Sequence, residues 1–338
     1  MPDTTGHPAL HLGAFLPTMT APGETLPDIA ASARHAEAVG LESVWAVDQL
    51  VAGTGAPFVD SIVSLAAAAA TTERIGLGFG VMIVPLRPPV WLAKQVASLQ
   101  QVAQGRVLLG VGAGGDRHDR SWAAVGVPRR ERGRRTDEVL DALPALVGGH
   151  PVDLGERLGL GVPRITTGRD ATGTSEDADA TVQLAPGEAM PPLLVGGMSD
   201  AALRRAIDHD AGWFLLPLPP DDVAAAVERA QAAATDRGRP TPAITTGMLI
   251  ALDGDPGLPS DATIEARLTD PDGMFGMPVE AARQMLVRGG VEAAADRLVA
   301  LRRAGADRVV ASIAAGDWSN QVSLFAEAGR IAADRVDR

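Results

Sequence analysis

Short runs of apolar residues alternate with longer amphipathic segments along most of the chain. This alternation is typical of a parallel α/β protein, in which each buried strand is followed by a helix that covers it. Most of the runs are almost continuously apolar, as expected for strands that are covered on both faces. The pattern predicts eight strands, at Leu12–Leu16, Ser43–Val47, Ile75–Val84, Val107–Val111, Leu193–Val195, Trp213–Leu216, Ile244–Ala251 and Arg308–Ile313.

The segments between these strands carry a helical period. Pro27–Val39, Val90–Ala103 and Val291–Ala304 each place apolar residues on one stripe at 3.6-residue spacing. Gly40 and Gly305 follow two of these helices at the position where glycine commonly ends a helix. Strand–helix units joined by right-handed crossovers predict an α/β fold of the (β/α)8 TIM-barrel type. A doubly wound open sheet is the alternative.

The chain has 338 residues, which exceeds the roughly 250 residues of a typical barrel of this kind and leaves room for loop insertions. Two segments rich in glycine, proline and polar residues interrupt the alternation, at about 161–192 and 253–290. The second ends in a short helical piece at Val279–Leu286. We expect a single domain over residues 1–338, with these two segments as insertions.

Composition narrows the classes of function. A formal net charge of −12 argues against nucleic acid or an anionic membrane as the main partner. The chain has no cysteine, which excludes disulfides, thiolate metal ligands and cysteine nucleophiles. The first residues do not read as a secretion signal, and no apolar run approaches the roughly 20 residues that span a bilayer. We therefore expect a cytoplasmic protein that acts on a small-molecule substrate.

Active sites of such barrels lie in the loops at the carboxyl ends of the strands. Asp48 and Gln49 directly follow the second predicted strand, and His118 lies in the loop after the fourth. These three are the candidate catalytic residues. A carboxylate at Asp48 has an ordinary alternative role, the capping of local backbone amides. No set of side chains has the spacing of metal ligands, so we predict no metal site.

Glycines mark two further places at these loops. A glycine inside a strand indicates close approach of a ligand or of a neighbouring side chain, and both remain open for the third strand. After the fifth strand the run Gly196-Gly197-Met198-Ser199 precedes a helix that begins at Ser199 or Asp200. Backbone N–H groups at a helix start can bind a phosphate. An ordinary N-cap at Ser199 is the alternative.

Several stretches resemble one family. The run ERIGLGFGVMIVPLRPPVWLAKQVASLQQVAQGRVLLGVGAGG resembles the luciferase-like monooxygenases, and within them the deazaflavin-dependent oxidoreductases. Four further stretches resemble other parts of the family's sequence. The second strand is matched by HAEAVGLESVWAVDQL, the fourth helix by VPRRERGRRTDEVLDAL, the phosphate loop by PPLLVGGMSDAALRRA and the last strand by GADRVVASIA. These matches follow one another in the family's order over most of the chain.

The resemblance implies a (β/α)8 barrel that holds a flavin-type ring at the carboxyl ends of its strands. The implied cofactor is the deazaflavin coenzyme F-420, with FMN as the alternative, and the implied assembly is a homodimer. Asp48 would lie near the reactive edge of the ring. The implied cofactor-binding residues are Gly80 and Val81 at a bulge that often contains a non-prolyl cis peptide, Met82 beside the ring, Gly112 behind it, and Gly196, Gly197, Met198 and Ser199 around the phosphate.

The chain departs from the family at two polar positions. Gln49 stands where a histidine often follows the aspartate, and glutamine cannot shuttle a proton near neutral pH. Ser121 precedes the aromatic Trp122, where many members carry a glutamate. The chain therefore lacks two polar groups that the family often has, and these groups would serve the acid–base half of the reaction.

The leading hypothesis is hydride transfer between coenzyme F-420 and an organic substrate, with Asp48, Gln49, His118 and Trp122 on the substrate side. The alternatives are an FMN-dependent monooxygenase and, in another class, a degenerate barrel that serves as a binding or scaffold subunit. A Schiff-base aldolase is disfavoured because the only lysine, Lys94, falls in a predicted helix.

Overall fold

The computed structural model describes residues 10–20, 25–51, 56–115, 120–153, 181–271 and 276–336. His118 and most of the insertion expected at 161–192 lie outside these residues. The chain forms two compact units, which are considered separately below. Unit 1 is built from Met1–Met82, Arg106–Gly112 and Pro192–Arg338, and unit 2 from Ile83–Gly105 and Ala113–Pro191. The expectation of a single domain stays a prediction.

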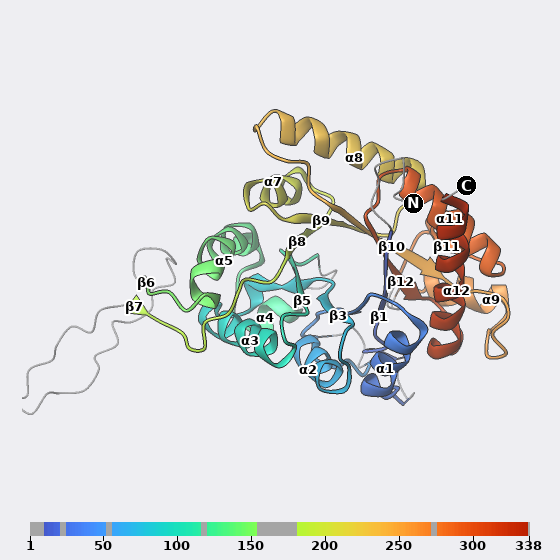
Figure 1. The fold of residues 1–338 in the computed structure, drawn as a ribbon, viewed down its shortest axis with the longest axis horizontal. Helices are drawn as coiled ribbons and strands as arrows, with labels where there is room; N and C mark the ends of the chain where they lie inside the picture. Colours follow the sequence, from blue (N-terminus) through green and yellow to red (C-terminus); the bar gives the residue numbers. More distant parts are fainter. Residues whose placement is uncertain are drawn as a thin grey trace, which may run out of the picture. The chain divides into compact units, whose positions relative to one another are not determined.

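Unit 1 contains a closed barrel of parallel strands (Figure 1). Each strand pairs with the next in the ring, and β10 closes the ring by pairing with both β9 and β12. This closure confirms the barrel and excludes the open sheet. The strands of the ring are β1 (His11–Phe15), β2 (Ser43–Ala46), β3 (Gly76–Phe79), β5 (Val107–Gly112), β8 (Leu193–Gly196), β9 (Gly212–Leu215), β10 (Ile244–Ile250) and β12 (Arg308–Ile313).

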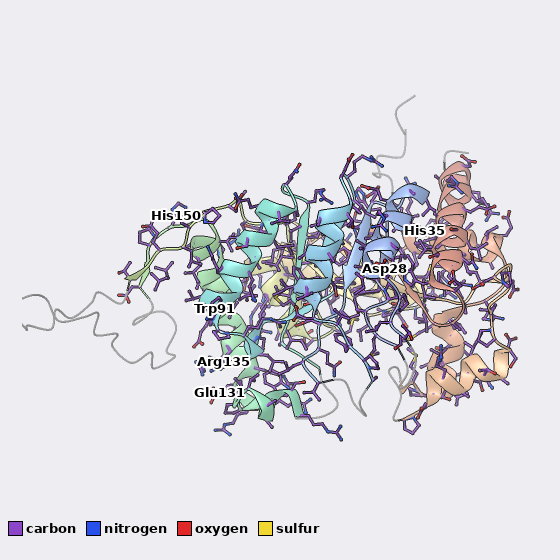
Figure 2. All side chains as sticks on the ribbon, turned by 90° about the horizontal axis from the view of Figure 1, so that it is seen from below. Asp28, His35, Trp91, Glu131, Arg135 and His150 are labelled. Carbon is purple, nitrogen blue, oxygen red and sulfur yellow. The ribbon has the colours of Figure 1, made fainter. Side chains whose placement is uncertain are left out.

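The helices of unit 1 begin and end at residues that the sequence marks. The Asp28 side chain accepts a hydrogen bond from the N–H of Ala31 and so caps α1, while Gly40 ends that helix at φ +93°. His35, labelled in Figure 2, lies on the same helix and forms a hydrogen bond with Ser323 on α12. The helices are α1 (Ile29–Val39), α2 (Ser61–Thr71), α7 (Asp200–Asp208), α8 (Pro220–Thr235), α9 (Asp261–Thr269), α10 (Val279–Met285), α11 (Val291–Arg303) and α12 (Trp318–Val336).

The third predicted strand is divided, which corrects the continuous strand expected at Ile75–Val84. β3 ends at Phe79, and the chain resumes as β4 (Met82–Ile83) followed by a short 3₁₀ helix, η1 (Val84–Leu86). Between them the Gly80–Val81 peptide bond is cis, as the family resemblance implied. The Gly80 N–H still donates to the carbonyl of Ala46 on β2, so the interruption begins only after this bond.

The expected insertion at 253–290 contains one helix that the sequence analysis missed. This helix is α9, and Ser260 caps it by accepting from the N–H of Thr263. The short helix expected near Val279 is present as α10. After it, β11 (Leu286–Val287) pairs with β10 outside the closed ring. Apolar side chains from α9 and α10 pack against the end of β10, so this insertion has a core continuous with the barrel wall.

The described part of unit 2 consists of helices and one small pair of antiparallel strands. It contains α3 (Pro89–Val102), α4 (Arg120–Ala124), η2 (Arg129–Glu131), α5 (Arg132–Val147), β6 (Val152–Asp153) and β7 (Thr181–Val182). The helix expected at Val90–Ala103 is confirmed as α3, and Trp91 stands exposed on it (Figure 2). A buried cluster of Ile83, Leu86, Trp122 and Val127 forms part of the core of this unit.

A few large side chains fill the barrel interior. The Trp45 ring, fully buried, packs edge-on against Phe214 with ring centroids 5.2 Å apart. A Cβ added at Gly78 would lie 2.2 Å from this indole, and one at Gly13 would lie 2.7 Å from its nitrogen. Glycine is therefore required on the strands beside Trp45, because any larger residue would overlap the ring. For Gly78 the open question is settled in favour of packing against a neighbouring side chain.

None of the helices within the described ranges is long and apolar enough to cross a bilayer.

Candidate active site

Val81 closes the barrel interior at the carboxyl ends of the strands. Its side chain packs with the interior cluster formed by Trp45, Leu194, Phe214 and Val310. Glycines on the two neighbouring strands make room for it. A Cβ at Gly112 would lie 2.7 Å from Val81 Cγ2, and one at Gly196 would lie 2.8 Å from Val81 Cγ1.

Gly80, Val81, Gly112 and Gly196 form what we call the glycine floor. A Cβ on Gly80 would lie 2.6 Å from the Phe15 ring, which itself stacks with Phe214 at a centroid distance of 6.4 Å. The three glycines are thus required because Val81 and Phe15 fill the space that their Cβ atoms would need, so these three residues contribute only backbone to the end of the barrel. The next residue, Met82, is completely buried, so its side chain presents no surface to a bound molecule.

The loop Gly196–Ser199 joins β8 to α7. Gly197 adopts φ +120°, a conformation that favours glycine, and its N–H donates to the carbonyl of Phe214 at 3.1 Å. Ser199 is the N-cap of α7, because its hydroxyl accepts from the N–H of Ala202 at 3.2 Å. The ordinary capping role considered for Ser199 is therefore present. Within the part of the chain that the structure describes, the N–H groups of Met198 and Ser199 have no hydrogen-bond partner.

Asp48 is buried directly after β2. It accepts a hydrogen bond from the hydroxyl of Ser61 at 2.9 Å, which ties it to the first turn of α2. Its neighbour Gln49 donates to the carbonyl of Val51 at 3.0 Å and so bonds within its own loop. Val47, on the other side of Asp48, has an exposed apolar side chain.

Thr18, which the sequence analysis did not single out, lies in the loop after β1. Its side chain is 1% exposed, and its hydroxyl is a buried polar atom that has no partner among the described residues. A buried hydroxyl without a partner is costly, so a bound molecule that hydrogen-bonds to it would be favoured. No sequence signal distinguishes it from other threonines, because the burial depends on the Phe58–Val59 segment, whose Val59 N–H bonds to the Thr18 carbonyl.

Two other residues were expected on the substrate side. His118 lies outside the described residues. Trp122 is 2% exposed within the buried cluster of unit 2. Across the described ranges, no group of histidine, aspartate and glutamate side chains has the arrangement of a metal site.

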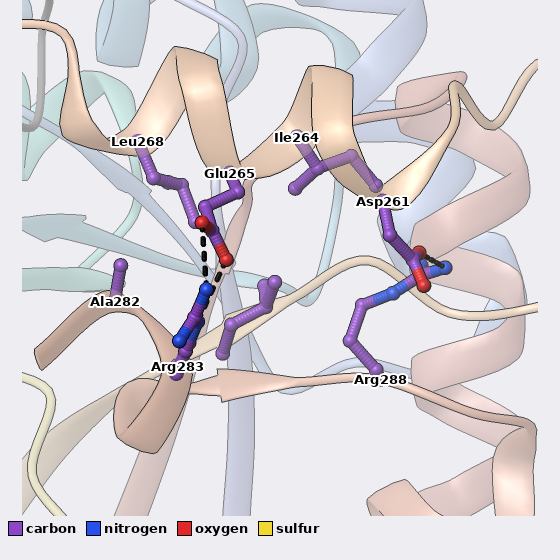
Figure 3. Close-up of a pocket in the computed structure, with 8 residues that line it drawn as sticks. Asp261, Ile264, Glu265, Leu268, Ala282, Arg283 and Arg288 are labelled. Atoms are coloured by element: carbon purple, nitrogen blue, oxygen red, sulfur yellow. Dashed lines mark hydrogen bonds and ion pairs between the residues drawn. The ribbon is translucent and has the colours of Figure 1, made fainter. Parts of the chain in front are cut away.

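A pocket on the insertion is a poorer candidate for a cofactor (Figure 3). It lies between α9 and α10 and has a volume of about 190 Å³, which is below the ~300 Å³ at which ligand pockets usually begin. Its charged side chains are already engaged. Arg283 donates to Glu265 at 2.8 Å, and Arg288 bonds to Asp261.

The sequence matches the profile of the luciferase-like monooxygenases over residues 9–256. The chain belongs to this family. The membership confirms the resemblance noted in the sequence and the enzyme class expected from it, that of oxidoreductases and monooxygenases. It also fits the geometry, since the glycine floor and the loop after β8 fall within the matched residues.

Curated relatives share about a third of the aligned residues. The chain is 33% identical over 189 residues to an uncharacterized protein of Mycobacterium tuberculosis, covering 56% of this chain and 58% of that protein. It is 30% identical over 242 residues to 4-hydroxyprotoasukamycin monooxygenase of Streptomyces nodosus subsp. asukaensis, covering 68% of this chain and 60% of that protein. The chain thus spans less than two thirds of these relatives' lengths.

Solved structures of similar fold include enzymes with two kinds of cofactor. An F-420-dependent secondary alcohol dehydrogenase in complex with an F-420–acetone adduct has a TM-score of 0.72 at 16% identity, covering 95% of this chain and 98% of that one. The oxygenating constituent of 3,6-diketocamphane monooxygenase from Pseudomonas putida, in complex with FMN, has a TM-score of 0.69 at 17% identity, covering 94% and 97%. At these identities the likeness shows the fold alone.

The residues present fit a flavin-type cofactor. A planar ring could lie against the glycine floor, where Val81 is the one side chain and Gly80, Gly112 and Gly196 add only backbone. An anionic tail needs hydrogen-bond donors, and the N–H groups of Met198 and Ser199 at the start of α7 are donors without partners in the described chain. The buried Thr18 hydroxyl is one further polar atom that a bound molecule could satisfy.

Proposed function

We propose that this protein is an oxidoreductase that binds the deazaflavin coenzyme F-420 at the carboxyl end of its barrel and supports hydride transfer to or from a small organic substrate. The family, which the sequence establishes, and the resemblance to its deazaflavin-dependent branch support this proposal. When bound, the coenzyme supplies the hydride chemistry, and the protein supplies binding and orientation.

The observation that carries the proposal is the pairing of bare backbone with unpartnered amides at one end of the barrel. Gly196 belongs to the glycine floor and also begins the loop that presents the Met198 and Ser199 amides. A molecule that combines a flat ring with an anionic tail matches both features at once. A ring without a tail, or a phosphate without a ring, would use only one of them.

The protein's own groups would then act on the substrate side. Asp48 would hold a proton or orient the substrate, because its carboxylate is kept in place by Ser61. Gln49 would contribute hydrogen bonds, and His118 a proton, from the loops after β2 and β5. Val47 and Leu216 follow β2 and β9 with exposed apolar side chains, which favours a largely apolar substrate.

A second candidate function is that of an FMN-dependent monooxygenase. The observation that favours it is the relative of 30% identity, which is a monooxygenase. The same floor and loop would bind FMN, since both cofactors combine a tricyclic ring with a phosphate. The family resemblance also supports a cytoplasmic location and a homodimer. Sedimentation of the purified protein would test the homodimer.

Titration of the purified protein with coenzyme F-420 and with FMN, followed by quenching of cofactor fluorescence, tests the proposal. We expect binding of F-420 at micromolar affinity and weaker binding of FMN. Tight binding of FMN alone would favour the monooxygenase. Binding of neither would overturn both and support the scaffold role. Turnover of any organic acceptor by the F-420-bound protein would exclude the scaffold role.

A further inference from the structure

Two side chains hold the loop after β8 from the outside of the barrel. The Trp213 indole N–H, on β9, donates to the carbonyl of Gly197 at 2.7 Å. The Arg229 guanidinium, on α8, donates to the carbonyl of Met198 at 3.1 Å. Two consecutive carbonyls of the loop are thus fixed by side chains from β9 and α8, the two elements that follow α7 along the chain. Figure 1 shows the course of these elements.

The two anchors also support each other. The Arg229 guanidinium lies over the Trp213 ring, 5.0 Å from its centroid, which is within the range of a cation–π interaction. Trp213 is completely buried, whereas Arg229 is exposed. The indole therefore has a fixed orientation, and it holds the guanidinium beside the loop.

Fixing these carbonyls also fixes the direction of two amides. A trans peptide unit is planar, and its C=O and N–H point in opposite directions. The peptide bonds after Gly197 and after Met198 are both trans. The Met198 N–H therefore points away from Trp213, and the Ser199 N–H points away from Arg229. These are the two N–H groups that have no partner among the described residues.

Charge at the start of α7 gives Arg229 a second effect. Asp200 is exposed in the first turn of this helix and adds a negative charge where an anion would bind. Arg229 places a positive charge next to the Met198 carbonyl and opposes that of Asp200. The bare helix start would otherwise be a poor site for an anionic phosphate.

We propose that Trp213 and Arg229 are positioning residues for the phosphate of the cofactor, which they do not touch: they hold the Gly197 and Met198 carbonyls outward so that the Met198 and Ser199 amides face the anion. This inference rests on the proposed function, because it needs a cofactor with an anionic tail. It goes beyond that function in assigning recognition of the phosphate to two side chains behind the loop.

The test compares cofactors with and without the phosphate. FMN is paired with riboflavin, and coenzyme F-420 with its phosphate-free deazaflavin chromophore. The variants are Trp213→Phe, which removes only the indole N–H, and Arg229→Met, which removes both the charge and the donor. Arg229→Gln keeps a donor without the charge. Arg237→Met is the matched control, since Arg237 is another exposed arginine just beyond α8 and pairs with Asp208.

We expect Arg229→Met to weaken binding of the phosphorylated cofactor by about tenfold, the equivalent of one hydrogen bond, with binding of its phosphate-free partner unchanged. Trp213→Phe should give the same selective loss. Arg229→Gln should lose affinity mainly at low salt, because an exposed charge is screened at high salt. The control should bind both cofactors as the wild type does.

Equal losses for both members of a pair would assign the two residues to packing and overturn the inference. So would unchanged binding in Arg229→Met, a variant of an exposed residue that is expected to fold even if Trp213→Phe does not. Failure of the wild type to bind any of the four compounds is a different result, because it overturns the proposed function itself.

Discussion

The Gln321 side chain amide lies 3.2 Å from a carboxylate oxygen of Asp255 and joins the loop after β10 to α12. The same glutamine exchanges two hydrogen bonds with the backbone of Leu252, at 2.7 and 2.9 Å. Asp255 also accepts from the N–H groups of Gly257 and Asp317. Although Asp255 is buried, its carboxylate accepts several hydrogen bonds, and these bonds join two loops at the carboxyl end of the barrel.

Asp255→Asn should destabilise the protein in a manner that depends on pH. Burial tends to raise the pKa of Asp255, but the hydrogen bonds from Gly257, Gln321 and its other donors outweigh burial and hold the pKa below its usual value. The stabilisation is present above the ordinary aspartate pKa and is lost as pH falls through the lowered value. We expect a cost of about 2–3 kcal/mol at pH 7, measured by urea unfolding, that shrinks below about pH 4. A cost that does not change with pH would contradict this assignment.

Thr18→Val should stabilise the protein and weaken cofactor binding. The substitution removes a buried hydroxyl that has no partner among the described residues while keeping the shape of the side chain. We expect the free energy of unfolding to rise by about 1 kcal/mol and affinity for the cofactor to fall. Thermal unfolding without cofactor measures the first effect, and fluorescence titration measures the second. If Thr18→Val is more stable but binds as the wild type does, the hydroxyl does not contact the cofactor.

Gly112→Ala should be rescued by shortening Val81. The added Cβ would lie 2.7 Å from Val81 Cγ2, so we expect a loss of about 1–3 kcal/mol from overpacking. Val81→Ala alone should also be destabilising, because it leaves a cavity. In the double variant the new methyl group occupies part of that cavity, and the combined loss should fall below the sum of the two. Simple additivity in urea unfolding would show that the two side chains do not meet.

Asp200→Asn should raise affinity for the phosphorylated cofactor. Removing a negative charge from the first turn of α7 leaves the helix dipole and Arg229 unopposed. The expected gain is about twofold to fivefold at low ionic strength, because such charge effects amount to about 0.3–1 kcal/mol at the surface. Riboflavin, which lacks the phosphate, serves as the control and should bind equally to both proteins. A gain for riboflavin as well would point to a change in the loop's conformation.

Most of the fold could be predicted from the sequence, because buried parallel strands consist of almost continuous apolar runs. Each of the eight strands is present, and β12 has the predicted bounds of Arg308–Ile313. The bulge at Gly80–Val81 followed from the family resemblance, since the apolar run itself continues through it. The helix α9 was missed because glycines and prolines surround Ser260, and their signal masked the capping residue.

Less of the candidate site could be predicted. The order of the loops and the position of the glycines were predictable from the sequence, and they indicate where a cofactor would lie. The contacts that organise the loop after β8 were not, because Trp213 and Arg229 lie 16 and 31 positions along the chain from their carbonyl partners. In the sequence they look like an ordinary core aromatic and an ordinary surface arginine. Only the folded backbone brings them to Gly197 and Met198.

The way in which Val81 sits among glycines also constrains how this barrel can evolve. Gly112 and Gly196 come from two strands, and a Cβ on either of them would crowd the same valine. Neither glycine can therefore gain a carbon atom unless the residue at position 81 becomes smaller. In an alignment of many relatives, substitutions here should be correlated, with a smaller residue at position 81 wherever one of the glycines has been replaced.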